Sequence, residues 1–326
     1  MDVPDYHLPE GAIAQEPIEP RDAARLLVAL TDPPAHRRVA DLPDLLEHGD
    51  VLVLNTSRVV PARLSLRKAT GGSAEVLLLE PVPGRLGEWE ALVRPGRRLA
   101  PGTVLFAGKE AVVEVGQRLA NGNRHVSSLV PDLSAYGTVA LPPYIHRPLD
   151  DAERYQTVYS KEPGSVAAPT AGLHLTHRVL DECQRRGVAI VHLDLAVGLG
   201  TFRPIKAGQV EGHSMGAERY RVPEETWRAC QEANRVVAVG TTTVRALESV
   251  AATGRLESRT ELFIQPGHHF SVVDVLLTNF HQPRSTLLVL LEAFAGPRWG
   301  LLYEVALREG YRFLSFGDAM IVSKAS

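Results

Sequence analysis

The chain has 326 residues, which predicts two domains or one large domain. It carries 35 basic and 38 acidic residues, and the net charge of −3 excludes a strongly basic nucleic-acid coat while leaving room for a local basic groove. Hydrophobic residues make up 44% of the chain and charged residues 22%, a composition that excludes a disordered protein.

Cysteine usage and the terminal segments indicate a protein of the cytoplasm. Cys183 and Cys230 lie far apart and outside any CxxC pair, which predicts neither a disulfide framework nor a zinc site. Residues 1–17 lack the apolar segment of a signal peptide, and the apolar run 287–291 is far shorter than the ~18 residues of a membrane span. The short apolar run also leads us to expect no membrane partner. The chain has no HExxH metal helix, so we expect no metal.

The first segment mixes helix and strand signals. Residues 21–30 run into an apolar strand, and the apolar run 51–55, bounded by turn residues, predicts a buried strand. Between them, Asp41 is expected to cap a short helix that has Pro43 in its first turn.

From about residue 64 to residue 150 the pattern changes to short aliphatic runs between Gly and Pro turns. This spacing predicts a small antiparallel β-barrel or sandwich. Residues 141–145 contain two consecutive prolines and predict an extended linker after it. The expected strands are 75–80, 89–93, 104–107, 111–115 and 124–130.

After about residue 151 helix and strand signals alternate, which predicts a mostly parallel sheet. We therefore expect a discontinuous α/β domain formed by residues 1–63 and 151–326, into which a β-domain of residues 64–150 is inserted. Helices are expected at 175–186, with Gly187 as the stop, and at 224–234, 244–252 and 287–294; strands are expected at 188–195, 235–240 and 318–322.

Two segments have the composition of ligand-binding turns. Residues 164–176 combine small residues, Pro and Gly in a turn that exposes backbone N–H groups, and His174 can exchange a proton near pH 7. Residues 197–204 hold two glycines and a threonine after a strand, which indicates a nucleoside loop although the pattern is not GxGxxG. The structural alternatives are a packed turn with His174 as a cap, and a bulged strand end.

A third segment, residues 239–249, follows an apolar strand that ends in Gly240. Three threonines are expected to cap the helix that begins there, and Arg245 and Glu248 share one face of this helix. Ligands of open α/β sheets bind beyond the carboxyl ends of such strands. The structural alternative is a capped helix with one surface ion pair.

A fourth segment, residues 277–286, places polar groups between an apolar run and an apolar helix. Ser285 and Thr286 can cap that helix, whereas Asn279 and His281 have no evident structural role. Asp318 begins the last apolar run, where aspartate is a turn residue in most proteins.

Together these segments resemble the S-adenosylmethionine:tRNA ribosyltransferase-isomerases, the QueA family of the queuosine pathway. The resemblance runs from about Asp5 to Val322. It is carried by IAQEP-EPRD (13–22), GSVAAPTAGLHLT (164–176), VGLGTFRPI (197–205), VGTTTVRALES (239–249), LLTNFHQPRSTLLVLLEAFAG (276–296) and YRFLSFGDAMIV (311–322).

The resemblance implies a reaction that consumes S-adenosylmethionine as a co-substrate. The ribosyl carbons move to the aminomethyl group of 7-aminomethyl-7-deazaguanine at the wobble position of tRNA, giving epoxyqueuosine and releasing adenine and methionine. The implied fold is an open α/β barrel with an inserted closed β-barrel. We expect a monomer.

The chemistry requires a base for the C5′ hydrogen that the sulfonium acidifies, a proton for adenine, polar partners for the ribose and a cation for the methionine carboxylate. The motif positions imply as catalytic residues His174, Glu248, His281 and Asp318, without deciding which is the C5′ base. They imply cofactor contacts at Thr170, Gly198, Gly200, Thr201, Thr241, Thr242, Arg245, Thr278 and Asn279, and acceptor or tRNA contacts at Asn55, Arg58, Arg63, Arg97, Arg98, His213 and Glu218.

Three positions depart from the family pattern. Thr56 stands in place of an aspartate, Ala196 in place of a histidine, and Gly216 in place of the second histidine of H-x-M-H-x-E-x-Y. Two other hypotheses therefore stand beside the tRNA enzyme. One is a paralogue that cleaves S-adenosylmethionine with a small-molecule amine as acceptor, and the other is a non-catalytic nucleoside- or RNA-binding descendant. The sequence leaves the acceptor and the order of bond breaking open.

Overall fold

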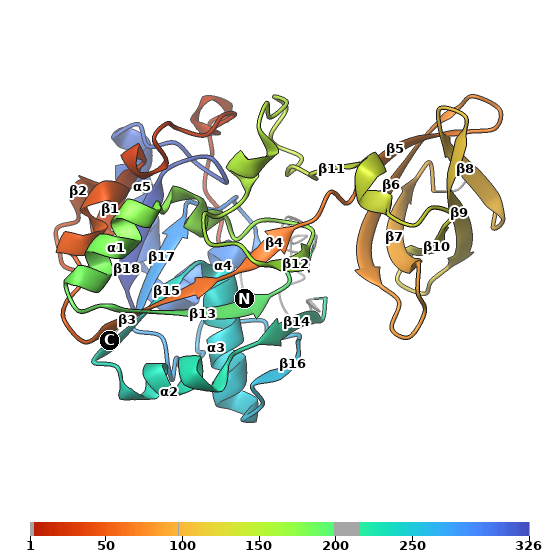
Figure 1. Cartoon of the computed structure of the whole chain (residues 1–326). Helices are drawn as coiled ribbons and strands as arrows, with labels where there is room; N and C mark the ends of the chain where they lie inside the picture. Colours follow the sequence, from red (N-terminus) through yellow and green to blue (C-terminus); the bar gives the residue numbers. More distant parts are fainter. Residues whose placement is uncertain (1–2, 97, 199–215, 326) are drawn as a thin grey trace. The chain divides into compact units, whose positions relative to one another are not determined.

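The computed structural model of the chain describes residues 3–96, 98–198 and 216–325 (Figure 1). It divides into two compact units. One, which we name the sheet unit, comprises Met1–Arg58, Pro142–Glu162 and Ala168–Ser326; the other, the barrel unit, comprises Val59–Leu141 and Pro163–Ala167.

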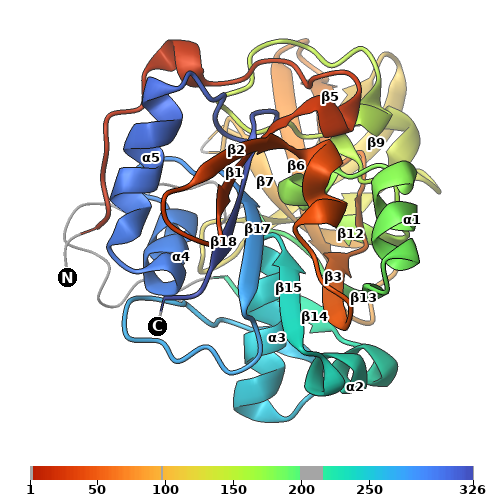
Figure 2. The same cartoon turned by 90° about the vertical axis from the view of Figure 1, so that its left-hand side faces the viewer.

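A large mixed sheet forms the centre of the sheet unit (Figure 2). In the described residues it has nine strands in the order β16-β14-β13-β3-β15-β17-β18-β1-β2. Their bounds are β1 Arg25–Ala29, β2 Ala35–Arg38, β3 Asp50–Asn55, β13 Ala189–Leu195, β14 Glu218–Arg221, β15 Arg235–Val239, β16 Glu257–Thr260, β17 Val275–Asn279 and β18 Ala319–Ser323.

The expectation of a mostly parallel sheet is wrong. Strands β13, β3, β15 and β17 are parallel neighbours, and β1 is parallel to β18. The pairs β16–β14, β14–β13, β17–β18 and β1–β2 are antiparallel. Residues 30–34 alone join β1 to β2, and so short a connection permits only an antiparallel pair.

Helices flank this sheet, and the sequence predicts most of them. Two helices, α4 and α5, connect β17 with β18 instead of the single expected one, and they pack against each other (Figure 2). Among the described residues, no helix combines the length and the apolar character needed to cross a bilayer. The bounds are α1 His177–Arg185, α2 Glu224–Glu232, α3 Thr241–Thr253, α4 Thr286–Ala295 and α5 Arg298–Arg308.

Local signals explain the ends of several helices. The hydroxyl of Thr176 accepts a hydrogen bond from the Val179 N–H at the start of α1, and Gly187, with φ +84°, follows its end as expected. The short helix near residue 41 is a 3₁₀-helix, Val39–Asp44, that begins after Arg38. Asp41 was expected to be its cap, but it lies inside the helix and accepts from the Arg38 N–H at 3.0 Å. The other 3₁₀-helices described are Glu10–Ala12, Arg21–Ala23, Leu133–Tyr136, Ala152–Tyr155 and Thr170–His174.

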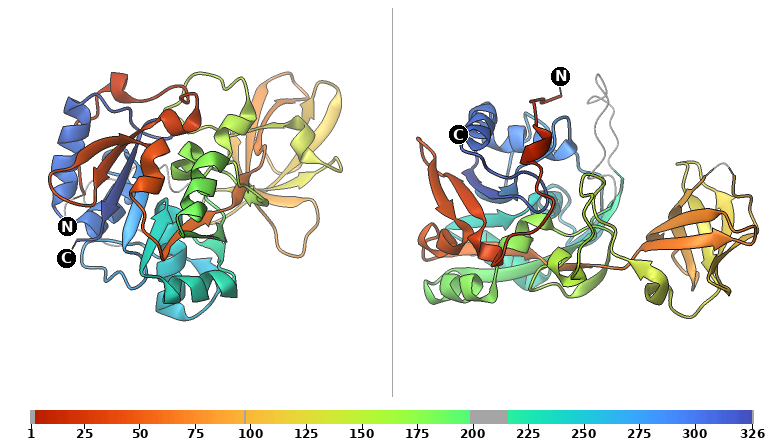
Figure 3. Two further views of the ribbon diagram at one scale, coloured as in Figure 1. Left: turned by 60° about the vertical axis from the view of Figure 1, so that its left-hand side comes forward. Right: turned by 90° about the horizontal axis from the view of Figure 1, so that it is seen from above.

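The barrel unit is a closed antiparallel β-barrel (Figure 3). Six strands follow the order β5-β6-β7-β10-β9-β8, and pairing of β5 with β8 closes the ring. This confirms the predicted fold class, an α/β protein with an inserted closed barrel. The bounds are β5 Arg63–Lys68, β6 Ser73–Pro81, β7 Glu88–Arg94, β8 Thr103–Ala107, β9 Glu110–Arg118 and β10 Arg124–Ser128, with β11 Gly137–Thr138 added beside β5 and the separate pair β4 Ser57–Val59 and β12 Glu162–Ser165.

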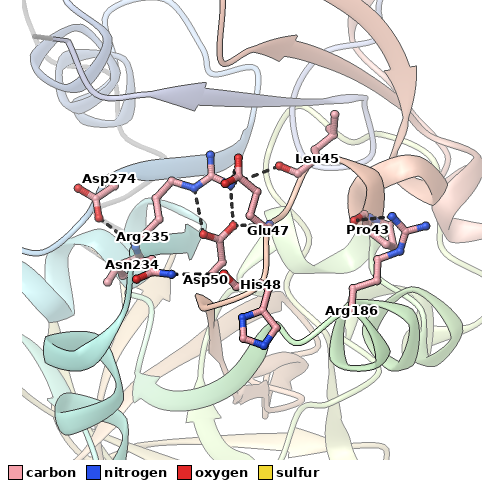
Figure 4. Close-up of polar contacts among 10 residues, drawn as sticks. Pro43, Leu45, Glu47, His48, Asp50, Arg186, Asn234, Arg235 and Asp274 are labelled. Carbon is pink, nitrogen blue, oxygen red and sulfur yellow. Dashed lines mark hydrogen bonds and ion pairs between the residues drawn. The ribbon is translucent and has the colours of Figure 1, made fainter.

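A polar network ties together the amino ends of β3 and β15 (Figure 4). Asp50, 1% exposed, accepts hydrogen bonds from Arg235 Nε at 3.1 Å and Nη2 at 2.6 Å. The Asn234 side chain donates to the His48 carbonyl, and Asp274 accepts from the Val236 N–H at 2.9 Å. The amino edge of the parallel strands is therefore occupied by structural contacts.

Candidate functional site

The opposite, carboxyl edge of the parallel strands holds a small hollow. It lies where β15 ends at Val239 and β17 ends at Asn279, the place where open α/β sheets bind their ligands. Its volume is about 30 Å³, room for an ordered water or one ligand group. The lining comes from all four segments that the sequence singled out: Ala168, Pro169, Thr170, Ala171, Val197, Gly240, Thr241, Thr242, Thr278, Asn279, His281 and Leu287.

A chain of hydrogen bonds runs from the hollow to a buried histidine. The Thr170 hydroxyl donates to Asn279 Oδ1 at 2.9 Å, and Asn279 Nδ2 lies 3.0 Å from His174 Nε2 and 3.2 Å from the Leu314 carbonyl. Because the amide nitrogen is a donor, His174 Nε2 acts as acceptor and its proton resides on Nδ1. Asn279 therefore links Thr170, which lines the hollow, to His174 behind it.

Burial keeps both histidines of the site neutral. Burial, together with the smaller effect of the positive charges of Arg312, Arg154 and Arg21, lowers the pKa of His174 to about 4. Burial alone lowers the pKa of His281 to about 3. The expectation that these imidazoles titrate near neutrality is therefore wrong, because their charged forms cannot be solvated.

His281 is held by contacts on both its side chain and its backbone. Its Nε2 lies 2.9 Å from the Thr278 hydroxyl, its N–H donates to the Tyr303 hydroxyl at 2.8 Å, and its carbonyl accepts from Tyr6. It lines the hollow and also a second cavity of about 30 Å³ beside it. Of the four expected catalytic residues, and within the described part of the chain, it is the one on the wall of the hollow.

The amino end of α3 faces the same hollow. Gly240, with φ +88°, precedes the helix in a conformation that side-chain-bearing residues rarely adopt. The threonines were expected to cap this helix, but within the described residues no side chain does so. Thr243 instead donates to the Val239 carbonyl at 2.7 Å, while Thr241 and Thr242 line the hollow. The Thr243 N–H donates to the Gly240 carbonyl at 3.1 Å, which leaves the N–H groups of Thr241 and Thr242 available to an anion.

A buried ion pair lies one turn further along α3. Arg245, 3% exposed, pairs with Glu218 of β14, 6% exposed, and the other oxygen of Glu218 accepts from the Gly198 N–H at 2.8 Å. The structural alternative, a surface ion pair on this helix, is wrong, since Arg245 and Glu248 are both buried and Arg245 pairs with Glu218 instead. Arg245 Nη2 is buried and has no hydrogen-bond partner in the described structure.

Comparison with known proteins identifies the chain's relatives. The family model described as "Queuosine biosynthesis protein" matches residues 2–322. The chain belongs to this family. An S-adenosylmethionine:tRNA ribosyltransferase-isomerase of Rubrobacter xylanophilus is 52% identical over 98% of this chain and 96% of its own, and one of Thermus thermophilus is 51% identical over 98% of each.

A solved structure of the family agrees. The crystal structure of S-adenosylmethionine tRNA ribosyltransferase from Thermotoga maritima is similar to this chain with a TM-score of 0.56 and 38% identity, over 98% of this chain and 99% of the other. The resemblance inferred from the motifs is thereby confirmed.

Two of the residues expected to be catalytic in this family member accept hydrogen bonds from backbone N–H groups. Glu248 accepts hydrogen bonds from the N–H groups of Ser271, Val272 and Val273 at 3.0, 3.1 and 3.1 Å. Asp318 accepts from the N–H groups of Arg25 at 2.9 Å and Arg312 at 2.8 Å. Both carboxylates thus hold loop segments that precede or follow strands of the sheet.

The residues expected to contact the acceptor are divided between the two units. Asn55 is fully hydrogen-bonded inside the sheet unit: Oδ1 accepts from the Leu195 and Ser57 N–H groups, and Nδ2 donates to the Leu195 carbonyl at 3.0 Å. Arg58 pairs with Glu153 in the sheet unit, and Arg63 and exposed Arg98 belong to the barrel unit. Arg97, Gly200, Thr201 and His213 lie outside the described residues.

One departure from the family pattern has a structural explanation. The Thr56 hydroxyl donates to the Leu193 carbonyl at 3.1 Å, a bond that the carboxylate of an aspartate cannot make. The Ala196 N–H bonds to the Arg219 carbonyl, and Gly216 is exposed. Nothing in the structure explains these two substitutions.

The sequence missed the second cavity beside the hollow. There the Tyr144 hydroxyl lies 2.7 Å from the Ser315 hydroxyl, and both residues share the lining with Thr170, Asn279 and His281. Tyr144 follows two prolines and was interpreted as part of a linker. The aromatic ring of Tyr144 is the one feature of the sequence that indicates packing against the fold at this position.

Proposed function

We propose that the chain is an S-adenosylmethionine:tRNA ribosyltransferase-isomerase. It transfers and isomerises the ribosyl group of S-adenosylmethionine onto 7-aminomethyl-7-deazaguanine in tRNA, giving epoxyqueuosine and releasing adenine and methionine. The observation that carries the proposal is that four motif segments, far apart in the sequence, meet in one hollow at the carboxyl edge of the sheet. The relatives that bear this enzyme name extend over nearly the whole chain.

The sheet unit is proposed to hold S-adenosylmethionine. The first-turn N–H groups of α3, at Thr241 and Thr242, suit the methionine carboxylate, because a helix amino end attracts an anion. Thr170 and Thr278 offer hydroxyl oxygens to the ribose, and Asn279 Oδ1 retains one acceptor position. The hollow admits only one group of the molecule, so the remainder lies at its mouth.

His281 is the proposed acceptor of the C5′ proton. With its own proton on Nε2, donated to Thr278, the imidazole keeps a lone pair on Nδ1. The C5′–H bond breaks, the proton goes to Nδ1, and the electron pair remains on C5′ beside the sulfonium. Burial keeps this base unprotonated at neutral pH but also weakens it, so the step depends on the acidity that the sulfonium gives the C5′ hydrogen. His174 positions Asn279.

The activating group in this proposal is the sulfonium of S-adenosylmethionine, whose positive charge withdraws electrons from C5′.

Product masses test the proposal. The protein is incubated with S-adenosylmethionine and either tRNA carrying 7-aminomethyl-7-deazaguanine or the free base. We expect the tRNA to gain the ribosyl mass and adenine to be released. Turnover with the free base alone supports the small-molecule paralogue, which the substitutions at Ala196 and Gly216 favour. If no adenine is released with either acceptor, the assignment of the chain as an enzyme is refuted.

A further inference from the structure

Charge is divided unequally between the two units. The barrel unit contains ten basic and seven acidic residues, a net charge of +3. The remainder of the chain contains 25 basic and 31 acidic residues, a net charge of −6. The slightly acidic total therefore conceals a basic module, and a polyanion would be attracted to the barrel.

The barrel has a broad hollow on the outer face of β5, β6 and β7. Its volume is about 710 Å³, far larger than the hollow at the carboxyl edge of the sheet. The strand register places Ser65, Glu75 and Arg94 in one row across the three strands, and Arg67 and Ser73 in the next row. All five line the hollow.

The two arginines of this hollow have no acidic partner in the part of the chain that the structure describes. Arg67 and Arg94 are exposed, and no carboxylate of the described residues lies within 4 Å of either guanidinium. Arg67 donates to the Gly71 carbonyl, at 3.2 Å. The one acidic residue of the lining, Glu75, lies 3.8 Å from Arg63, which offsets its charge. Elsewhere on the barrel, by contrast, Arg85 pairs with Glu88 at 3.2 Å.

We propose that this hollow binds the phosphodiester backbone of the tRNA, with Arg67 and Arg94 each contacting a phosphate. Strands β5 and β7 are separated by β6, so the two arginines start about 10 Å apart and reach different phosphates. Guanidinium groups bind phosphate oxygens in a fork, and the Ser65 and Ser73 hydroxyls, which line the same hollow, add donors. That the bound polyanion is a tRNA rests on the proposed function. The phosphate site itself rests on the net charge of the barrel unit and on the two arginines of its hollow.

Charge reversal tests the site in the full-length protein. The variant R67E/R94E is compared with R85E/R118E, which makes the same charge change on the same barrel outside the hollow. Binding of a fluorescein-labelled tRNA transcript is followed by anisotropy between 50 and 200 mM KCl. Each phosphate contact contributes about 0.7–0.9 to the salt slope, so loss of two lowers the slope by roughly 1.6. We expect R67E/R94E to bind about tenfold more weakly at low salt and R85E/R118E to stay near the parent.

Several outcomes overturn the proposal. Equal salt slopes in the parent and R67E/R94E refute the site, and this is also the result expected if the hollow binds an acidic protein. Equal weakening by R85E/R118E indicates a diffuse charge effect instead. Should R67E/R94E not fold, R67Q/R94Q replaces it, with the same expected direction. Adenine release with modified tRNA is measured in parallel, so failure of the enzyme assignment is distinguished from failure of this site.

Discussion

Acidification should destabilise the sheet unit through its two buried histidines. In the unfolded chain the pKa of each imidazole returns to about 6.5, whereas in the folded chain it is about 4 for His174 and about 3 for His281. Between these values the unfolded state binds more protons than the folded state. The free energy of unfolding is therefore unaffected above pH 6.5 and falls as the pH drops below it.

The size of the loss in unfolding free energy follows from the difference between the working pH and the pKa of the unfolded chain. One pH unit corresponds to about 1.4 kcal/mol for each proton, and pH 5 lies about 1.5 units below the unfolded pKa. Each histidine should then cost about 2 kcal/mol, and the pair about 4 kcal/mol, between pH 7.5 and pH 5. This is a large part of the roughly 5–15 kcal/mol by which domains are stable.

Urea unfolding at pH 7.5 and pH 5 measures this change in the free energy of unfolding. The variant H174Q retains an acceptor for Asn279 but does not titrate, so its change between the two pH values should be about 2 kcal/mol smaller than that of the parent. H281Q should behave likewise, and the double variant should lose about 4 kcal/mol of the pH dependence. H177Q, at an exposed ring, is the control. If H174Q and H281Q keep the full pH dependence of the parent, the burial argument is refuted.

Three further predictions concern single residues. Asn279→Ala removes the amide between Thr170 and His174, and we expect a loss of about 2–4 kcal/mol in urea unfolding and at least tenfold slower adenine release; normal turnover would contradict the proposed site. Asp50→Ala leaves Arg235 with only Glu47, 3.8 Å away, as an acidic neighbour at the far edge of the sheet, so stability should fall by about 3 kcal/mol while turnover below the melting temperature stays unchanged. Gly240→Ala, at φ +88°, should cost about 1–2 kcal/mol and raise the KM for S-adenosylmethionine; an unchanged KM would argue against cofactor binding at α3.

Local patterns in the sequence were enough for most elements and for the barrel. The apolar runs that became β3 and β15 are continuous and bounded by turn residues, because strands buried on both faces require no polar alternation. The short runs between Gly and Pro turns correctly indicated an antiparallel barrel. Each of these signals depends on neighbours in the chain, which is why a single sequence contains them.

Only the tertiary structure showed which strands of the sheet are antiparallel and which side chains its buried polar residues contact. The sequence did not reveal α5, and with it the return of the chain to the carboxyl edge, where Asn279 of β17 pairs with Ala319 at the start of β18. Nor did it reveal the pairing of Arg245 with Glu218, which lies 27 residues away and meets it only when α3 and β14 come together in the folded chain.

Titration behaviour has the same dependence on the fold. A histidine in a motif is expected to titrate near neutrality, but His174 and His281 are buried by segments distant in sequence, and burial lowers their pKa. Residue type and spacing thus singled out Thr170, Thr241, Thr242, Thr278, Asn279 and His281, which line the hollow, together with His174, Glu248 and Asp318, which do not. Desolvation and long-range pairing, which arise only when the chain folds, determined which of them remain free to react.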